Sequence, residues 1–387
     1  MNIHTVKLGQ TLDGIAAQYG IATERLTENN SIKNGVAEGR ELLILTPTRT
    51  HRVKRGEDLS MLASRFGVRR EELMMRNPSL AASRLTEGKE LVIRYPEPTR
   101  GTIAVNAYFN KSASVEKLRQ IIHYITYLTV SAYRLEKDGL RRLFDAKNAV
   151  RIGREGGKVV LMRVEDGTEG EFFTEEPRRS EYIDALIALA KSGGYSGITL
   201  SLGNLEGERS EVFCKFLIEL RQKMIGSELI LFTELNERTP SCISEVSDGS
   251  VLSFCKRAHR AAPSFGCSDA AVYKKLADEA ESSKVFIGID TFAHGDKSVI
   301  GLTELFSRWE DVKIVTDESA LTSCAMLQGE EFKFCSLKNL KAKLDLVYEL
   351  GYMGVSFDIM SIPREYLLLI YALFHPVHFY LPFSLPI

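Results

Sequence analysis

Four carboxylates fall at or just beyond the carboxyl ends of predicted strands, and they are the first candidates for chemistry. They are Glu206, Glu234, Asp290 and Asp358. In a parallel sheet these strand ends meet at one edge, so such groups could hold a cation or act as acid and base in a hydrolysis. In the plainer interpretation they pair with Lys256, Arg257 or solvent.

The histidines and cysteines show no metal-binding pattern. His259, His294, His375 and His378 lack the spacing of metal ligands, and no two cysteines form a CxxC pair. We therefore expect no metal and no cofactor. We also expect the cysteines, which all lie in the second half of the chain, to be reduced thiols.

Composition narrows the class of protein. The 387 residues are 44% hydrophobic and 26% charged, with a net charge of -1. This balance provides no positive field for nucleic acid or for an anionic membrane, so neither is an expected partner. The N-terminus has no basic segment followed by an apolar one, and no apolar run reaches the roughly 20 residues of a membrane-spanning helix. We expect synthesis in the cytoplasm without a signal peptide.

The elements that must position the carboxylates follow residue 101. Short apolar runs alternate there with helical patterns, which is typical of βα units around a parallel sheet. The predicted strands are 102–108, 125–131, 158–162, 197–202, 228–233, 250–255, 284–289 and 353–357, and the predicted helices are 115–124, 181–191, 208–224, 269–281 and 337–350. Eight such strands predict an α/β fold, a TIM-like (β/α)8 barrel over 101–387. A small inserted subdomain is expected at about 294–335.

An internal repeat precedes the barrel. Residues 4–44 recur at 51–93, so that Gly9, Leu12 and Asn30 match Gly56, Leu59 and Asn77. Each copy has the pattern strand, turn, helix, turn, helix, strand, which predicts two small α+β (βααβ) modules at 2–46 and 50–95. Residues 96–101 contain two prolines one residue apart and form a stiff linker.

The repeated pattern resembles the LysM module. Its signature is carried by Val6-Lys7-Leu8-Gly9-Gln10-Thr11-Leu12 and by Val53-Lys54-Arg55-Gly56-Glu57-Asp58-Leu59. The resemblance implies binding of N-acetylglucosamine-containing glycans, peptidoglycan or chitin, in a shallow groove between two loops. The implied groove residues are Gly9, Gln10, Thr11, Leu12, Asn30, Ser31 and Ile32 in the first copy, and Gly56, Glu57, Asp58, Leu59, Asn77, Pro78, Ser79 and Leu80 in the second. Gln10 and Glu57 stand where the family usually has Asp. Alternatively, the modules only mediate protein assembly.

Four segments of the large domain resemble the family 18 glycoside hydrolases. Residues 102–108, 125–139, 287–296 and 337–357 are similar to the first, second, seventh and last strand regions of that barrel. Two LysM modules before such a barrel are the layout of the endospore LysM–family 18 proteins, which act on cortex peptidoglycan during germination. The resemblance therefore covers nearly the whole chain.

The family's catalytic motif is missing. Its fourth strand carries Asp-Gly-x-x-x-Asp-x-Glu, in which the Glu protonates the leaving oxygen and the preceding Asp orients the substrate acetamide. Here Gly203 stands at the acid position and Ser201 at the orienting position. The family's Tyr after strand six and Trp after strand eight are also replaced, at residues 254–257 and at Asp358. The site resembles one that has lost its chemistry.

These observations favour a glycan-binding protein with a catalytically inactive glycosidase-like barrel, associated with the spore coat, cortex or cell wall. Its expected partner is peptidoglycan or another N-acetylglucosamine-containing glycan. Two alternatives stay open: an active N-acetylglucosaminidase with a relocated acid, and a structural spore-coat component that contacts other coat proteins. A cytoplasmic location also fits the N-terminal sequence.

Overall fold

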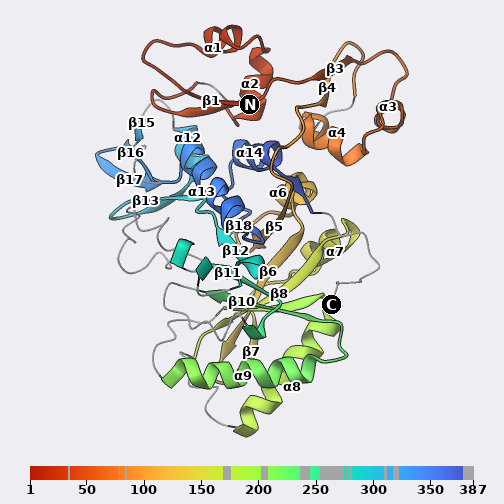
Figure 1. Cartoon of the computed structure of the whole chain (residues 1–387), viewed down its shortest axis with the longest axis vertical. Coiled ribbons are helices and arrows are strands. Elements are labelled where there is room, and N and C mark those ends of the chain that lie inside the picture. The colour runs from red at the N-terminus through yellow and green to blue at the C-terminus, as the bar shows by residue number, and fades with distance from the viewer. Residues whose placement is uncertain are drawn as a thin grey trace.

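The computed structural model places two small modules at one end of a larger α/β barrel (Figure 1). It describes residues 1–33, 35–77, 79–82, 85–168, 176–201, 208–235, 245–252, 273–275, 277–278, 281–308, 312–316 and 322–377. Within them, no helix is long and apolar enough to cross a membrane, and no group of three or more His, Cys, Asp or Glu side chains could hold a metal ion.

The two modules have the predicted order of elements. The first consists of β1 (Asn2–Thr5), α1 (Leu12–Gln18), α2 (Thr23–Asn29) and β2 (Glu41–Ile44), and the second of β3 (Arg49–Arg52), α3 (Leu59–Phe66), α4 (Arg70–Arg76), the short α5 (Ser79–Ala82) and β4 (Glu90–Arg94). In each module the two strands pair antiparallel. Thr11 and Asp58 begin α1 and α3 by accepting hydrogen bonds from the N–H groups of Gly14 and Met61. Each module encloses its own small apolar core.

Eight parallel strands form the closed barrel that the sequence predicts. They are β5 (Thr102–Phe109), β6 (Tyr127–Glu136), β8 (Val159–Asp166), β9 (Gly197–Ser201), β10 (Ile230–Leu235), β11 (Gly249–Leu252), β12 (Val285–Gly288) and β18 (Gly354–Asp358). The barrel closes because β5 pairs with both β6 and β18. Gly197 opens β9 at a point where a Cβ would lie 2.3 Å from the Ile230 carbonyl oxygen, so a larger residue would push two strands apart.

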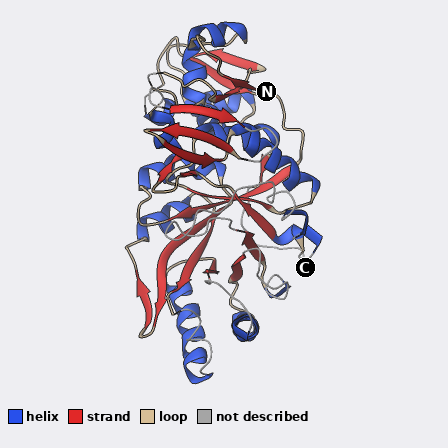
Figure 2. Ribbon diagram, turned by 90° about the vertical axis from the view of Figure 1, so that its left-hand side faces the viewer, coloured by secondary structure: helices blue, strands red, loops and turns tan. Residues whose placement is uncertain are grey.

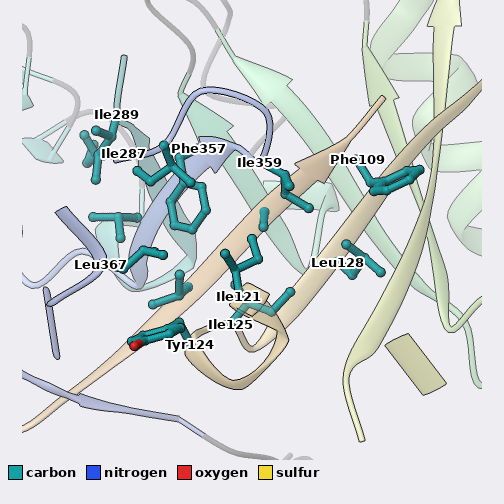
Figure 3. Close-up of a cluster of buried hydrophobic side chains, with 14 of the residues drawn as sticks. Phe109, Ile121, Tyr124, Ile125, Leu128, Ile287, Ile289, Phe357, Ile359 and Leu367 are labelled. Carbon is teal, nitrogen blue, oxygen red and sulfur yellow. The ribbon is translucent and has the colours of Figure 1, made fainter. Parts of the chain in front are cut away.

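Helices pack around the outside of this sheet. They are α6 (Val115–Ile121), α7 (Lys147–Glu155), α8 (Glu176–Ser192), α9 (Glu208–Met224), α13 (Leu337–Glu349) and α14 (Arg364–Leu373), with short 3-10 turns at Ile122–Tyr124 and Ser282–Lys284. The strand β7 (Gly139–Arg142) forms a hairpin with β6, and β19 (His375–Pro376) pairs with β5. Figure 3 shows part of the layer between strands and helices, where Leu128, Ile287 and Phe357 of the barrel lie near Ile121 and Leu367 of the helices.

A second sheet is inserted between β12 and α13. It is antiparallel and has the order β14-β13-β17-β16-β15. Its strands are β13 (Phe292–His294), β14 (Val299–Gly301), β15 (Val312–Thr316), β16 (Ser323–Leu327) and β17 (Glu330–Phe334), accompanied by α12 (Leu302–Ser307). Figure 2 shows the molecule as an elongated body with the small modules and the barrel at opposite ends.

Inward-facing side chains of the barrel change from apolar to polar along the strands. The rings of Tyr127, Phe232 and Phe286 form an apolar layer inside the barrel, further from the carboxyl ends of the strands. Their ring centroids lie 5.3 to 5.7 Å apart. Side chains two residues further along a strand face the same way. The step from Leu161 to Arg163 and from Phe232 to Glu234 therefore brings charge to the carboxyl end of the barrel, the face where such barrels carry their sites.

The expectation that all the cysteines are reduced thiols is wrong. Cys214 of α9 is disulfide-bonded, whereas Cys324 and Cys335 form no disulfide. The spacing of cysteines along a chain does not reveal which of them meet in space, so this bond could not be read from the sequence.

Candidate functional site

Three neighbouring strands bring Arg163, Ser201 and Glu234 together at the barrel mouth. Arg163 Nε donates to Glu234 Oε1 at 2.6 Å, and Arg163 Nη2 donates to Glu234 Oε2 at 3.0 Å and to Ser201 Oγ at 2.6 Å. The side chains of Arg163 and Glu234 are only 17% and 15% exposed. Bidentate, charge-assisted hydrogen bonds of this kind are roughly twice as strong as neutral ones.

The ion pair determines the protonation state of Glu234. Burial alone would raise the pKa of this carboxyl, but the charge and hydrogen bonds of Arg163 outweigh burial and hold the pKa below its ordinary value. Glu234 is therefore ionised at neutral pH and has no proton to donate. Arg163 itself was not among the predicted site residues. The signal available in the sequence was its position two residues after Leu161, which places both side chains on the same face of the strand.

A neutral polar layer lies in the barrel beside this ion pair. Asn106 Nδ2 donates to Ser356 Oγ at 3.0 Å, and Thr129 Oγ1 donates to Asn106 Oδ1 at 2.8 Å. The Arg163 guanidinium lies 5.9 Å from the centroid of the Tyr108 ring. Burial, together with the negative charge of Glu234, raises the pKa of Tyr108 well above its ordinary value, so the phenol stays protonated.

The other predicted carboxylates have separate partners. Asp358 accepts from Asn110 Nδ2 at 2.6 Å and from the Met360 N–H at 2.8 Å, and burial nevertheless raises its pKa. Asp290 accepts from the Phe292 N–H at 2.9 Å and pairs with His294 Nε2 at 2.6 Å, which ties the end of β12 to β13. Gly203 and Glu206 lie outside the described residues, as do 254–257.

In the modules, the residues after the turn glycines stabilise the turn itself through hydrogen bonds. Gln10 Oε1 accepts from the Lys7 N–H and from His4 Nε2, both at 2.9 Å. Glu57 makes the same two contacts, with the Lys54 N–H at 2.9 Å and His51 Nε2 at 2.7 Å, and adds an ion pair with Arg65. The hydrogen bond from His51 and that from Lys54 lower the pKa of Glu57 to about 2.

Asn30 and Asn77 hold the second loop of each module to its closing strand. Asn30 donates to the carbonyls of Leu26 and Leu43 at 2.9 and 3.0 Å and accepts from the Leu43 N–H at 2.6 Å. Asn77 makes the equivalent bonds to Leu73 and Val92. Both residues are buried, so these side chains hold the loop in place and do not face solvent.

What the predicted grooves present to solvent is mainly turn backbone and small side chains. Gly9 and Gly56 adopt positive φ angles of 79° and 81°, and Thr11 and Asp58 are exposed. Leu12 and Leu59 are half-buried, as are Gln10, Glu57 and Ser79, while Ile32 and Leu80 are buried. Pro78 lies outside the described residues. Exposed turn N–H and C=O groups beside an apolar residue can hydrogen-bond an acetamido group and pack its methyl.

Both modules contact the helix α14, which lies between them and the strands (Figure 1). Ser31 Oγ of the first module donates to Glu365 Oε2 at 3.0 Å. At the end of α4 in the second module, the Met75 carbonyl accepts from Arg364 Nη2 at 2.9 Å and from Tyr124 Oη at 2.7 Å. The loop containing Ser31 is therefore partly engaged by the barrel.

Comparisons with known proteins extend these observations. The LysM domain family model matches residues 4–44 and 51–94. The putative sporulation-specific glycosylase YdhD of Bacillus subtilis (strain 168) is 22% identical over 251 residues, a segment that covers 62% of this chain and spans 59% of the length of that relative.

Two solved structures share the fold. The spore cortex-lytic enzyme SleL of Bacillus megaterium QM B1551 superposes with a TM-score of 0.75 at 19% identity, covering 98% of this chain and 99% of that chain. A GH18 chitinase from Cycas revoluta, in complex with (GlcNAc)3, superposes with a TM-score of 0.59 at 15% identity, covering 70% of this chain and 98% of that chain. The chain therefore carries two LysM domains, and its barrel has the fold of the family 18 glycoside hydrolases.

Proposed function

We propose that this protein binds peptidoglycan through its LysM domains and that its barrel does not hydrolyse the bound glycan. The observation that carries the second half is the bidentate pair between Arg163 and Glu234, with Ser201 as a third partner. The names of the relatives, a sporulation-specific glycosylase and a spore cortex-lytic enzyme, support a glycan of the spore or cell wall.

The electrostatics of the mouth oppose the family's reaction. Substrate-assisted hydrolysis passes through a cationic intermediate, which the family stabilises with a carboxylate next to the acid. Here Ser201 occupies that position and contacts a guanidinium whose charge Glu234 balances, so this position supplies no negative charge to the intermediate. Glu234 cannot replace the missing acid, because an ionised carboxylate does not protonate a leaving group.

Two measurements on the full chain test the proposal. We expect no new reducing ends when the protein is incubated with cortex fragments or muropeptides. We also expect sedimentation with insoluble peptidoglycan that soluble tri-N-acetylchitotriose reverses. Turnover would contradict the inactive barrel. Absence of retention would contradict glycan binding and leave the structural spore-coat component as the better hypothesis.

One observation favours a second candidate function, an N-acetylglucosaminidase with a relocated acid. Asp358 lies at the end of β18, and burial raises its pKa, which is the property of a general acid. Turnover that disappears in Asp358→Asn but persists in Asp290→Asn and Glu234→Gln would establish this function in place of the first.

The proposed location is the spore or cell envelope. A fluorescent fusion produced in sporulating Bacillus subtilis is expected to concentrate at the forespore surface. Uniform fluorescence throughout the cytoplasm would contradict this location.

A further inference from the structure

Two arginines lie opposite each other in the second LysM domain. Arg49 is the first residue of β3 and Arg94 is the last residue of β4, and the two are partners across this antiparallel pair of strands (Figure 1). Both residues are exposed. Like charges directly opposite each other on paired strands repel and reduce stability. This end of the strand pair is therefore a place that a bound anion would stabilise.

Phe66, the last residue of α3, holds both guanidinium groups in place. The Arg49 guanidinium lies 4.6 Å from the centroid of the Phe66 ring, and Arg94 Nη2 donates to the Phe66 carbonyl at 3.3 Å. The first contact is a cation–π interaction, which orients the planar guanidinium. Because both groups are already positioned around one residue, little conformational freedom is lost when they bind a ligand.

Neither arginine has a carboxylate partner in the described part of the chain. The ion pairs of this domain use other arginines: Glu57 pairs with Arg65, and Glu72 pairs with two arginines of α4. The contacts of Arg49 and Arg94 there are those with Phe66 and the pairing of the two strands. The two positive charges therefore have no counter-ion among the described residues.

The first LysM domain lacks this pair of charges. Its residues at the equivalent positions of the repeat are Asn2 and Leu45. Residues 49–95 contain eleven Lys and Arg against six Asp and Glu, whereas residues 2–46 contain four against five. The positive charge is therefore a property of the second domain and is not required by the fold that the two domains share.

We propose that Arg49 and Arg94 together bind a carboxylate of the peptides attached to the glycan. The planar fork of donors on each guanidinium matches the oxygens of a carboxylate, which a Lys ammonium does not. The proposal rests on the proposed function in one respect, that the ligand is peptidoglycan. It adds a contact outside the loops 56–59 and 77–80, and it makes the second domain prefer a peptide-bearing glycan to a neutral one.

Titration of the isotope-labelled full chain with muramyl dipeptide, followed by NMR of the arginine Nε–H groups, tests the site directly. We expect the signals of Arg49 and Arg94 to shift with this ligand, which carries one carboxylate. They should not shift with tri-N-acetylchitotriose, which carries none. This measurement uses the wild-type protein and so does not depend on the folding of any variant.

Sedimentation with insoluble peptidoglycan, freed of phosphate polymers, tests the same site on the polymer. Arg49→Gln/Arg94→Gln should weaken retention about fivefold, as expected for two exposed charge pairs. On peptidoglycan whose carboxylates have been converted to amides, the variant and the wild type should bind equally. Arg119→Gln/Lys191→Gln removes two exposed charges from α6 and α8 and is the matched control, which should bind like the wild type.

The outcomes separate this site from the proposed function. Unshifted Arg49 and Arg94 signals, equal retention of the double variant and the wild type, or the same loss on amidated peptidoglycan each overturn the site and leave the proposed function intact. A difference that appears only on walls that keep their phosphate polymers also overturns it, because the ligand is then a phosphate. Absence of wild-type retention removes the proposed function, whereas the shifts with muramyl dipeptide still support or overturn the carboxylate site.

Discussion

Arg163 and Glu234 form a bidentate ion pair that spans β9, the strand lying between β8 and β10. The third hydrogen bond, from Arg163 to Ser201, connects the intervening strand to the same guanidinium. One side chain thus cross-links three strands at the face where a family 18 enzyme has its acids. The local charge is balanced, and no carboxyl group of this cluster is protonated at neutral pH.

Removing only one partner of this ion pair is expected to destabilise the barrel strongly. Arg163→Met leaves the Glu234 carboxylate buried without a partner, and we expect it to lower the free energy of unfolding by about 3–5 kcal/mol. The double variant Arg163→Met/Glu234→Leu should recover most of this loss. Urea denaturation followed by circular dichroism measures both.

The matched control is an exposed ion pair on α7. The side chains of Arg151 and Glu155 are 53% and 61% exposed, so Arg151→Met should change the unfolding free energy by less than about 1 kcal/mol. An Arg163→Met variant as stable as this control would show that the barrel mouth does not depend on the ion pair.

The strands of the barrel and the elements of the two modules could be predicted from the sequence alone. Each barrel strand contains a short apolar stretch that is buried, as in Val285–Gly288, and such stretches are recognisable without knowledge of their neighbours. The predicted helix 208–224 coincides with α9. The LysM pattern was recognisable because it occurs twice in register.

The features that the sequence did not predict depend on contacts between distant residues. Arg163 and Glu234 are 71 positions apart, and only barrel closure makes them partners. The helix α14 was missed because residues on nearly all its sides are buried, which leaves no polar face and therefore no helical periodicity to detect. In the sequence, this apolar run is too short to span a membrane and carries no other signal.

Glu57 predicts a pH dependence for the second LysM domain. Its pKa falls from 4.5 to about 2 on folding, so its stabilising effect is complete above about pH 4.5 and is lost as the pH falls toward 2. Glu57→Gln, which copies the residue of the first module, should be less stable than the wild type at pH 7. The difference in unfolding temperature between the two proteins should vanish near pH 2.

The first module supplies the reciprocal test. Gln10→Glu places a carboxylate against His4 and the Lys7 N–H, in the arrangement seen around Glu57. Its stability relative to wild type should rise as the pH increases through about 4.5. A Glu57→Gln difference that is constant from pH 7 to pH 2 would contradict the assignment.

The effect of Asp358 on stability should change with pH in the opposite direction. Burial raises its pKa above 3.8, so the folded protein binds this proton more tightly than the unfolded chain and loses stability as the carboxyl ionises. Asp358→Asn removes that penalty while keeping an acceptor for the Met360 N–H. We expect it to unfold at a higher temperature than wild type at pH 7 and at the same temperature below pH 3.8. Equal unfolding temperatures at both pH values would show that this carboxyl is not destabilised by burial.

A second buried ion pair joins the first LysM domain to α14. Arg40 Nη2 donates to Glu365 Oε1 at 2.9 Å, and the two side chains are 2% and 1% exposed. Arg40 also lies 4.6 Å from the ring centroid of Phe306. Glu365 further accepts from Ser31 Oγ, so one carboxylate on α14 holds two segments of the domain.

We therefore expect Glu365→Ala to separate the domain from the barrel. The variant leaves the Arg40 charge buried and unpaired, which should weaken the contact by about 3–5 kcal/mol. Differential scanning calorimetry should then show an additional, earlier transition, and limited proteolysis should cut near residues 46–50. Glu349→Ala, at an exposed carboxylate on the neighbouring α13, is the control and should behave like wild type. If Glu365→Ala instead unfolds in the same single transition as the control and resists protease equally, the domain is held by its apolar contacts alone, and the ion pair fixes its orientation without contributing to its attachment.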